Sequence, residues 1–590
     1  MADAEHRAFW ADAVADEVEA RDPDDPIVVK GAVSPSGIPH VGHVNEILRG
    51  YYVAEVLRER GHEVEQLFVA DDRDALRAVP RQLCDADWNL VELGDVDAGA
   101  LGRNLGVPYT DVPDPFGDCH DSYGAHFTAL LRESAAMLDV PLEVTSTTAL
   151  YESGAFDEAV RETLADLGRA RKVLGEFQDS VDAEYVPFMA NCASCGRQLS
   201  TTVTGVDLDR EVVAYECTGG EAGDREVEGC GHAGEATFRE GKLPWRFEWP
   251  AGWRALDVDF EPFGKDHAEG SWPSGQAIAR EVYGTEPPVP LVYEWFTLDG
   301  EALSSSSGNV VTVPALLDVV SPATLRYFFA LNPRKQRDLS VERVDRLADG
   351  FDRFEALFMD EEADPAIGPL AERAYPFVLP PGELPEGAVA AGREAGTLPA
   401  DAPAAGDADG ARPGDDPLHP TELGGYDAYR RFLAETFADR VRLPYTFAAV
   451  LGMTDDESLR RSLARRAGHL HDDTPEWAVA GALARVPLAR TWAERTDNEY
   501  NYRLAAERPA VDLDDDTAAA LADVADVVAA GADGDAIQGE FYEAAERHGV
   551  DAGDCFAAGY ELFFGQPSGP RLGPFLAGLD PGFVEERLRQ

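Results

Sequence analysis

The stretch 26–43, PIVVKGAVSPSGIPHVGH, decides the fold of this chain. Its apolar run at 26–33 predicts a buried strand, and the Ser, Gly and Pro residues that follow predict a turn. From 41 to 60 apolar residues recur at helical spacing, and Gly61 is placed to end that helix. The segment 62–70, HEVEQLFVA, predicts the next strand. Together they predict a βαβ unit of a doubly wound nucleotide-binding fold, with the functional site where strand meets helix.

Two histidines lie at this predicted junction, in the H-x-G-H motif of His40, Gly42 and His43. A helix N-terminus offers unpaired N–H groups, and imidazoles can donate hydrogen bonds to phosphoryl oxygens. Gly42 leaves room for an adenine ring against the backbone. Histidines at a helix start can also serve only as caps, but the preceding strand and the nearby glycines favour function. The turn that would accompany them in nucleotide binding comprises Pro35, Ser36 and Gly37.

The pattern changes along the chain divide it into parts. Residues 1–184 and 245–339 predict two halves of one Rossmann-like catalytic domain, and 185–244 a cysteine-bearing insertion. Residues 340–590 follow helical spacing, except that 361–425 is rich in Pro, Gly and Ala and predicts a mobile surface insertion. The predicted fold class is α/β, a doubly wound parallel sheet with a zinc-ribbon-like insertion and an all-α C-terminal domain.

The composition is strongly acidic. Among 590 residues, 110 Asp and Glu face 51 Lys and Arg, giving a net charge of −59. Such self-repulsion destabilises a compact chain in dilute buffer but is screened in concentrated salt, where the Debye length is about 3 Å at 1 M. We therefore expect an extreme halophile. The acidic start does not resemble a targeting peptide, and no long apolar run occurs, so we expect a cytoplasmic protein with no membrane partner.

Four of the seven cysteines are clustered, and they supply a set of thiolates typical of a tetrahedral zinc site. The candidate ligands are Cys192, Cys195, Cys217 and Cys230. His232 could replace one thiolate, and unrelated reduced cysteines are the alternative. With four protein ligands the Zn²⁺ would be structural, because no coordination position stays open.

A serine-rich segment follows a strand-like stretch and a turn at Asp299 and Gly300. Its hydroxyl groups at Ser304, Ser305 and Ser306 could fold over phosphates, although a plain linker is the better interpretation of the segment taken alone.

With these motifs in order, the chain resembles the class I aminoacyl-tRNA synthetases and, within them, the class I lysyl-tRNA synthetases of archaeal type. His40 to His43 resembles the first class signature, and 302–306 lies where the second is expected. Three longer segments carry the resemblance more specifically, namely 110–127 (TDVPDPFGDCHDSYGAHF), 256–271 (LDVDFEPFGKDHAEGS) and 292–310 (VYEWFTLDGEALSSSSGNV). The match covers roughly the first 340 residues well.

The resemblance implies ATP-dependent activation of L-lysine to lysyl-adenylate and its transfer to the terminal adenosine of tRNA(Lys), with Mg²⁺ accompanying ATP. The helical domain would bind the anticodon. His40 and His43 would stabilise the transition state, and the three serines would close on the β- and γ-phosphates. One departure matters: Ala302 and Ser305 stand where the class usually has lysines. We hypothesise that Lys265, which with His267 belongs to the implied ATP site, or Mg²⁺ replaces part of that charge.

The resemblance also implies a lysine pocket with aromatic walls for the stem and an acid for the ammonium. The matched positions, beside His267, are Ser34, Trp245 and Tyr293, and the nearest acids are Asp71, Asp72 and Asp74, of which Asp72 is the chosen candidate. An exposed acidic face and core aromatics are the plainer interpretations of these residues.

Three alternatives to a lysine-tRNA ligase remain. A glutamyl-type ligase needs arginines in its pocket, a non-catalytic tRNA-binding paralogue would explain the missing lysines, and a small-molecule nucleotidyltransferase would not need the helical tail. In concentrated salt, RNA binding must rest on local arginines and stacked bases. Candidates in the helical domain are Arg430, Arg431, Arg440, Arg442, Arg460, Arg461, Arg465 and Arg466. The sequence does not give the oligomeric state, and a monomer is the working expectation.

Overall fold

The computed structural model describes residues 8–117, 119–302, 310–403 and 419–589. Its centre is a five-stranded parallel sheet with the strand order β14-β13-β1-β2-β5. These strands are β1 (Ile27–Val33), β2 (Val64–Ala70), β5 (Glu143–Ser146), β13 (Phe260–Gly264) and β14 (Val289–Tyr293). The predicted strands at 26–33 and 62–70 are β1 and β2, and the predicted α/β class is confirmed.

The order of the strands reverses beside β1. The chain runs outward from β1 through β2 to β5, then returns to place β13 and β14 on the other side of β1. In such sheets ligands bind outside the carboxyl ends of the strands at this point of reversal. The helices around the sheet are α1 (Trp10–Glu19), α2 (Val41–Glu59), α4 (Tyr123–Ala136), α8 (Trp245–Ala255), α9 (Lys265–Glu269), α10 (Ser271–Glu281), α11 (Val313–Leu317) and α12 (Pro322–Ala330).

Helix α2 is the predicted helix at 41–60, and it is buried on nearly every face. The cause is its position between the sheet and α1 and α12, where apolar side chains on all sides find partners. The strand β1 is likewise apolar along its length, as expected for a central parallel strand covered on both faces.

The cysteine-bearing part is built mainly of short antiparallel strands. They are β6 (Met189–Ala190), β7 (Thr201–Asp207), β8 (Val212–Cys217), β9 (Gly219–Ala222), β10 (Arg225–Glu228), β11 (Ala233–Thr237) and β12 (Gly241–Lys242). Its core also takes in three helices, α5 (Thr147–Ser153), α6 (Asp157–Ala165) and α7 (Leu167–Gly175). The packed unit therefore begins before residue 185, because α5 to α7 bury their apolar faces against the cysteine part and α10.

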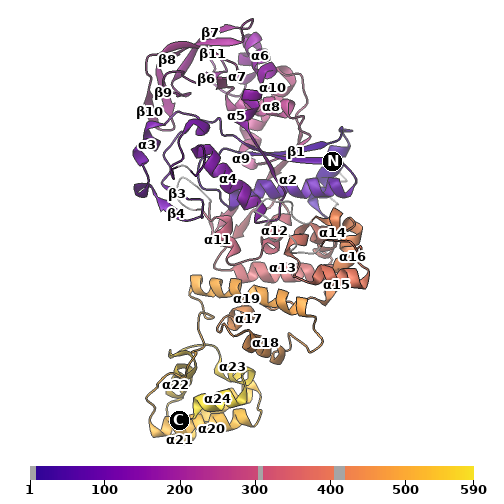
Figure 1. Cartoon of the computed structure of the whole chain (residues 1–590), viewed down its shortest axis with the longest axis vertical. Helices are drawn as coiled ribbons and strands as arrows, with labels where there is room; N and C mark the ends of the chain where they lie inside the picture. The colour runs from indigo at the N-terminus through magenta and orange to yellow at the C-terminus, as the bar shows by residue number, and fades with distance from the viewer. Residues whose placement is uncertain (1–7, 118, 303–309, 404–418, 590) are drawn as a thin grey trace.

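Smaller elements complete the upper part of the molecule (Figure 1). They are β3 (Gln82–Cys84), β4 (Leu90–Glu92), α3 (Ala98–Arg103), β15 (Phe296–Leu298), β16 (Glu301–Ala302) and β17 (Arg337–Leu339). Strands β15 and β16 form a hairpin, and β17 adds to it in parallel with β15.

The rest of the described chain is helical and extends the molecule away from the sheet, with the C-terminus at the far end (Figure 1). The helices are α13 (Val344–Phe358), α14 (Gly368–Val378), α15 (Ala388–Ala395), α16 (Tyr426–Glu435), α17 (Tyr445–Leu451), α18 (Glu457–Arg466), α19 (Glu476–Thr496), α20 (Asp515–Ala529), α21 (Gly534–His548), α22 (Ala552–Phe564), α23 (Leu572–Gly578) and α24 (Pro581–Leu588). None of the helices in the described ranges is long and apolar enough to cross a membrane.

The expected mobile insertion at 361–425 differs from what the structure shows. Helices α14 and α15 lie inside it, and side chains such as Tyr375 and Phe377 are buried in the main core. The Pro and Gly residues that predicted a loop mostly bound these short helices: α15 lies between Gly387 and Gly396, both with positive φ. Residues 404–418 of this segment lie outside the described ranges.

Candidate functional site

The site-forming residues gather at the carboxyl edge of the parallel sheet. The turn from Ser34 to His40 follows β1, Asp72 follows β2, Lys265 follows β13, and Tyr293 ends β14. Each of these strands runs in the same direction, so their carboxyl ends meet at one edge, beside the point where the strand order reverses. The residues predicted from distant parts of the sequence thus share one region.

The H-x-G-H motif forms the start of α2. His40 is the N-cap residue, and its Nδ1 accepts the N–H of Gly42 at 3.0 Å. His43 Nδ1 accepts the N–H of His40 at 3.3 Å, and the two rings stack with centroids 4.1 Å apart. Because each Nδ1 accepts a hydrogen bond, the proton of each neutral ring is on Nε2. The motif therefore presents two Nε2–H donors near a helix N-terminus.

Burial determines the charge of these rings. It lowers the pKa of His40 to about 4, and it lowers the pKa of His43 well below its usual value, with the neighbouring His40 adding to the effect. Both imidazoles are therefore neutral at pH 7. They can donate hydrogen bonds to a phosphoryl oxygen without themselves carrying positive charge.

The turn that leads into α2 is also fixed. Tyr123 on α4 donates its hydroxyl to the carbonyl of Ser36 at 2.8 Å. Pro35 is buried, and Gly37 lies against the same tyrosine hydroxyl. This holds the predicted nucleotide-binding turn at the mouth of the sheet.

A buried ionic cluster lies beside Ser34. The Ser34 hydroxyl donates to Asp74 at 2.8 Å, and Lys242 Nζ lies 2.5 Å from the other oxygen of Asp74. Lys242 also lies 2.5 Å from Glu248 Oε2, and its side chain is only 1% exposed. The acid in contact with Ser34 is therefore Asp74.

Asp72, the predicted lysine-binding acid, is committed to other partners. It accepts hydrogen bonds from Ser146 Oγ at 2.5 Å and from the Thr148 N–H at 2.9 Å, which ties β2 to the start of α5. Asp71 and Asp72 are both buried, so the alternative of an exposed acidic face is wrong for them. Burial raises the pKa of Asp71 to about 7, with further repulsion from Asp74 and Glu248.

Glu46 on α2 is a further acid that the sequence analysis missed. It accepts the N–H of Ala32 at 2.7 Å and the hydroxyl of Tyr293 at 3.0 Å. Burial raises its pKa to about 8. Its place three residues after His43, on the helix that follows β1, was the available signal. The contact holds Tyr293 across the carboxyl edge of the sheet.

Aromatic rings line another side of the site. Trp245 stacks on Trp249 with centroids 5.1 Å apart, and His267 lies 5.8 Å from Trp245. Trp245 Nε1 donates to Ser271 Oγ at 3.2 Å. Tyr293 is 8% exposed and Trp245 is half-buried, so both are packed, yet both border the edge that carries the histidines.

Lys265 is already paired. Its Nζ lies 2.5 Å from Glu294 Oε2 and 4.9 Å from the ring centroid of Trp295. A role with pyrophosphate therefore requires this ammonium to leave or share Glu294. The serines of the second signature, Ser304 to Ser306, lie outside the described ranges.

The hairpin that carries the serine segment is described. Its turn is at Asp299 and Gly300, both with positive φ, as the sequence predicted. Asp338 on β17 accepts Thr297 Oγ1 at 2.6 Å and the Gly300 N–H at 2.7 Å, which fixes the turn.

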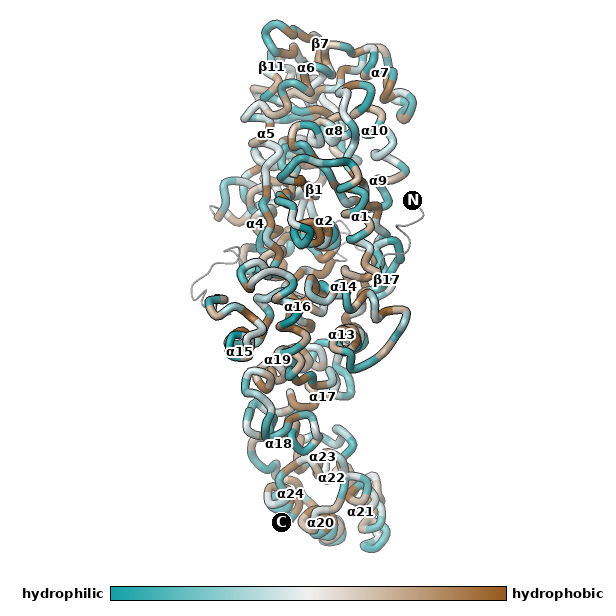
Figure 2. The backbone as a smooth tube through the Cα atoms, turned by 90° about the vertical axis from the view of Figure 1, so that its right-hand side faces the viewer, coloured by the Kyte–Doolittle hydropathy of each residue, from teal (hydrophilic) through white to brown (hydrophobic). Residues whose placement is uncertain are grey.

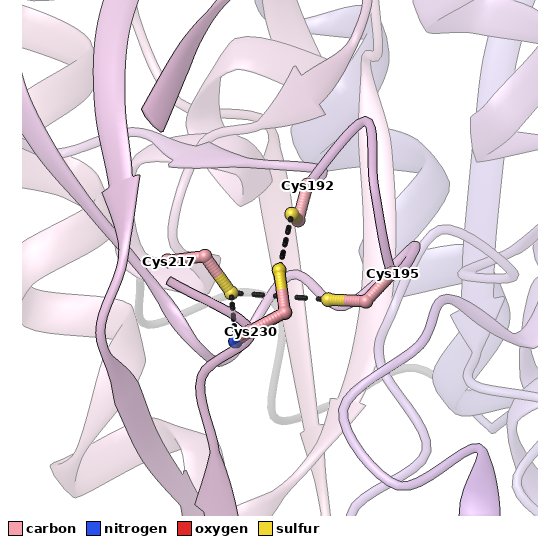
Figure 3. Close-up of side chains that lie close together, drawn as sticks. All are labelled: Cys192, Cys195, Cys217 and Cys230. Carbon is pink, nitrogen blue, oxygen red and sulfur yellow. Dashed lines mark hydrogen bonds between the residues drawn. The ribbon is translucent and has the colours of Figure 1, made fainter. Parts of the chain in front are cut away.

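Four thiols converge in the cysteine part, as Figure 3 shows. Cys192 Sγ lies 3.6 Å from Cys230 Sγ, and Cys195 Sγ lies 3.8 Å from Cys217 Sγ. A tetrahedral zinc with bonds of about 2.3 Å places its sulfur ligands about 3.8 Å apart, so the cluster fits Zn²⁺. His232 is not a member of this group.

A second group that could hold a metal consists of Asp114, His120 and His126. The Nδ1 atoms of the two histidines are 3.2 Å apart, and each lies 3.6 Å from Asp114 Oδ2. These separations are close to the roughly 3.3 Å expected between nitrogen and oxygen ligands of one tetrahedral zinc. His126 Nε2 contacts the carbonyl of Cys84 at 2.9 Å, which orients the ring. The sequence signal was the pair of histidines six residues apart within 110–127.

Comparison with known proteins was made for the whole chain. The family described as tRNA synthetases class I (K) matches residues 8–372. A Lysine--tRNA ligase of Natronomonas pharaonis is 57% identical over 99% of this chain and 98% of its own length. That of Haloarcula marismortui is 56% identical over 99% and 97%, and that of Pyrococcus horikoshii is 28% identical over 98% and 99%. The first two relatives are from halophilic archaea.

Proposed function

Because the chain belongs to the class I tRNA synthetase family, we propose that it acts as a lysine-tRNA ligase. It would activate L-lysine with ATP and transfer the lysyl group to the 3′ terminal adenosine of tRNA(Lys). The observation that carries the proposal is the meeting of the neutral His40 and His43 pair with an acid-rich, aromatic-lined edge of the sheet. We place the activity in the cytoplasm, in keeping with a cluster of four free thiols.

The first step is attack of a lysine carboxylate oxygen on the α-phosphorus of ATP. A bond forms between that oxygen and phosphorus, and the bond to the pyrophosphate leaving group breaks. The Nε2–H groups of His40 and His43 donate to phosphoryl oxygens as negative charge develops there. Mg²⁺ arriving with ATP, Lys265, and the hydroxyls of Ser304 to Ser306 would serve the departing phosphates. In the second step a ribose hydroxyl of tRNA attacks the adenylate carbonyl, and AMP leaves.

The choice of lysine over glutamate follows from the charges at the edge of the sheet. A substrate carboxylate needs an uncommitted cation, whereas the cations near this site already have partners in the described structure. Lys30 pairs with Glu261, and Lys242 pairs with Asp74 and Glu248. Arg49 and Arg73 donate to backbone carbonyls. Acids such as Asp74 instead favour a substrate that brings its own ammonium.

The test is amino-acid-dependent pyrophosphate exchange in molar KCl with saturating tRNA, run with lysine and glutamate side by side. We expect exchange and charging with lysine and none above background with glutamate. Exchange with glutamate alone would favour the glutamyl-type alternative. Tight tRNA binding without exchange or charging by either amino acid would favour the non-catalytic paralogue.

A further inference from the structure

Arginine partners in the helical part narrow the search for a nucleic-acid surface. Of the eight arginines that the sequence pointed to, only Arg465 has neither an ion pair nor a side-chain hydrogen bond within the described structure. Arg430 pairs with Glu59, Arg440 and Arg442 with Glu355, Arg460 with Asp455, and Arg461 with Glu457 and Glu476. Arg431 and Arg466 donate to the carbonyls of Thr397 and Leu579. These side chains mainly stabilise the fold.

A different stretch holds cations without such partners. Between 334 and 346 the chain carries Arg334, Lys335, Arg337, Arg343 and Arg346. Among the described residues, none of these five side chains makes an ion pair or hydrogen bond, although acids outnumber cations 110 to 51 in the whole chain. In so acidic a protein most exposed cations meet a carboxylate, so a run of unpaired cations points to an anionic partner.

Three of these arginines line one cavity, which we call the arginine pocket. It has a volume of about 360 Å³ and lies between α12, β17 and the start of α13. Arg337, Arg343 and Arg346 line it together with one acid, Asp338, whose carboxylate already accepts the hydrogen bonds of the β15–β16 hairpin. Arg337 Nε is buried without a hydrogen-bond partner. An unpaired buried donor is costly, and a bound anion oxygen would satisfy it.

The position of the pocket suits a long anion better than a small one. Arg334 and Lys335 lie on the turn before β17, and the Pro333 carbonyl in that turn accepts the N–H of Glu294, the partner of Lys265. The unpaired cations therefore run from the edge of the active site to the start of the helical part. Figure 2 shows β17 and α13 at this junction. A chain of phosphates could follow that line, whereas one phosphate could engage only part of it.

We propose that the arginine pocket and the turn before it bind backbone phosphates of RNA. The proposal rests on the proposed function, which makes tRNA the RNA in question. Planar guanidinium groups hold phosphate through paired hydrogen bonds, and this geometry persists in salt better than long-range attraction. The first-turn N–H groups of α13 add positive potential on the same side.

The test compares Arg343→Gln/Arg346→Gln with the wild type in lysine charging at varied tRNA concentration. Both side chains are exposed, so the fold should persist, as a thermal melt will show. We expect the KM for tRNA to rise roughly tenfold, while pyrophosphate exchange at saturating tRNA stays within twofold. The slope of log affinity against log salt should fall by roughly two, one for each lost phosphate contact. Arg337→Gln, measured separately, should raise the KM for tRNA in the same direction.

The control is Lys172→Gln/Arg225→Gln, which removes two exposed and unpaired cations from the cysteine part. It changes the net charge equally and should leave the KM for tRNA unchanged. The proposal is overturned if the pocket variant keeps the wild-type KM and salt slope, or if the control variant raises the KM as much. Absence of lysine-dependent exchange in the wild type would instead refute the proposed function.

Discussion

The protonation state of His40 and His43 is set by their surroundings rather than by their position in the motif. An ordinary histidine is partly charged near neutral pH, and two charged rings stacked 4.1 Å apart would repel. Burial keeps both neutral, with the pKa of His40 lowered to about 4. The motif then acts on phosphate through hydrogen bonds, and positive charge must come from elsewhere.

Replacing His43 with alanine removes one of the two donors. We expect lysine-dependent pyrophosphate exchange at saturating tRNA to fall about 100-fold, the usual loss for one transition-state hydrogen bond. His62→Ala, a change at a surface histidine beside Glu19, is the matched control and should keep the wild-type rate. Equal rates for both variants would contradict the role given to His43.

The same burial makes stability depend on pH. Between pH 4 and 6.5 the unfolded chain protonates His40 while the folded chain does not, so the unfolded state binds more protons. The free energy of unfolding should therefore rise with pH across this window, and His40→Gln should make the rise shallower. Chemical denaturation at several pH values in molar KCl measures both.

At the scale of elements, short structures held by a few contacts carry the site. The β15–β16 hairpin is fixed by Asp338 from β17, so the serine segment starts from a rigid stem. Arg326 on α12 joins the two halves of the molecule, because it donates to Leu138 in the upper part and to Phe377 and Val378 of α14. The cysteine part similarly depends on four thiols from strands and loops.

Zinc at the four cysteines should therefore be structural. We expect Cys217→Ser to lose one equivalent of zinc by metal analysis and stability on the order of 4 kcal/mol, because metal binding and folding of such a site are coupled. Cys555→Ala removes a buried thiol from α22, outside the cluster, and should keep all the bound zinc. Unchanged zinc content in Cys217→Ser would refute the assignment. Zinc that remains in it after that loss would be tested at Asp114, His120 and His126.

Over the whole molecule, charge repulsion and arginine ion pairs oppose each other. Arg373 joins Asp12 and Glu59, and Arg430 also joins Glu59, so these pairs connect α1 and α2 to the helical part. Yet most of the 110 acids have no cation available to them. The balance between attraction across this junction and repulsion over the surface depends on how strongly the solvent screens charge.

Salt should therefore stabilise and activate the protein. We expect both the Tm and the rate of lysine charging to rise with KCl into the molar range, because screening removes repulsion among the excess acids. Sucrose at matched osmolality is the control, since it stabilises folded proteins without screening charge. A maximum in dilute buffer, or an equal effect of sucrose, would contradict the halophile interpretation.

The sequence by itself determined the features that depend on neighbouring residues. The βαβ unit, the H-x-G-H motif, the turn at Asp299 and Gly300 and the cluster of cysteines are local patterns, and each predicts its structure without a partner from elsewhere. The family and the acidic character could likewise be inferred from the chain alone.

Only the tertiary structure decided which charges meet. Asp74 rather than Asp72 contacts Ser34, Lys242 neutralises that acid from 168 residues away, and Glu46 reaches Tyr293 across the sheet. The same holds for the arginines, which are committed in the helical part and unpaired between 334 and 346. Spacing along a chain carries no information about such contacts, because folding brings together residues whose separation in sequence is arbitrary.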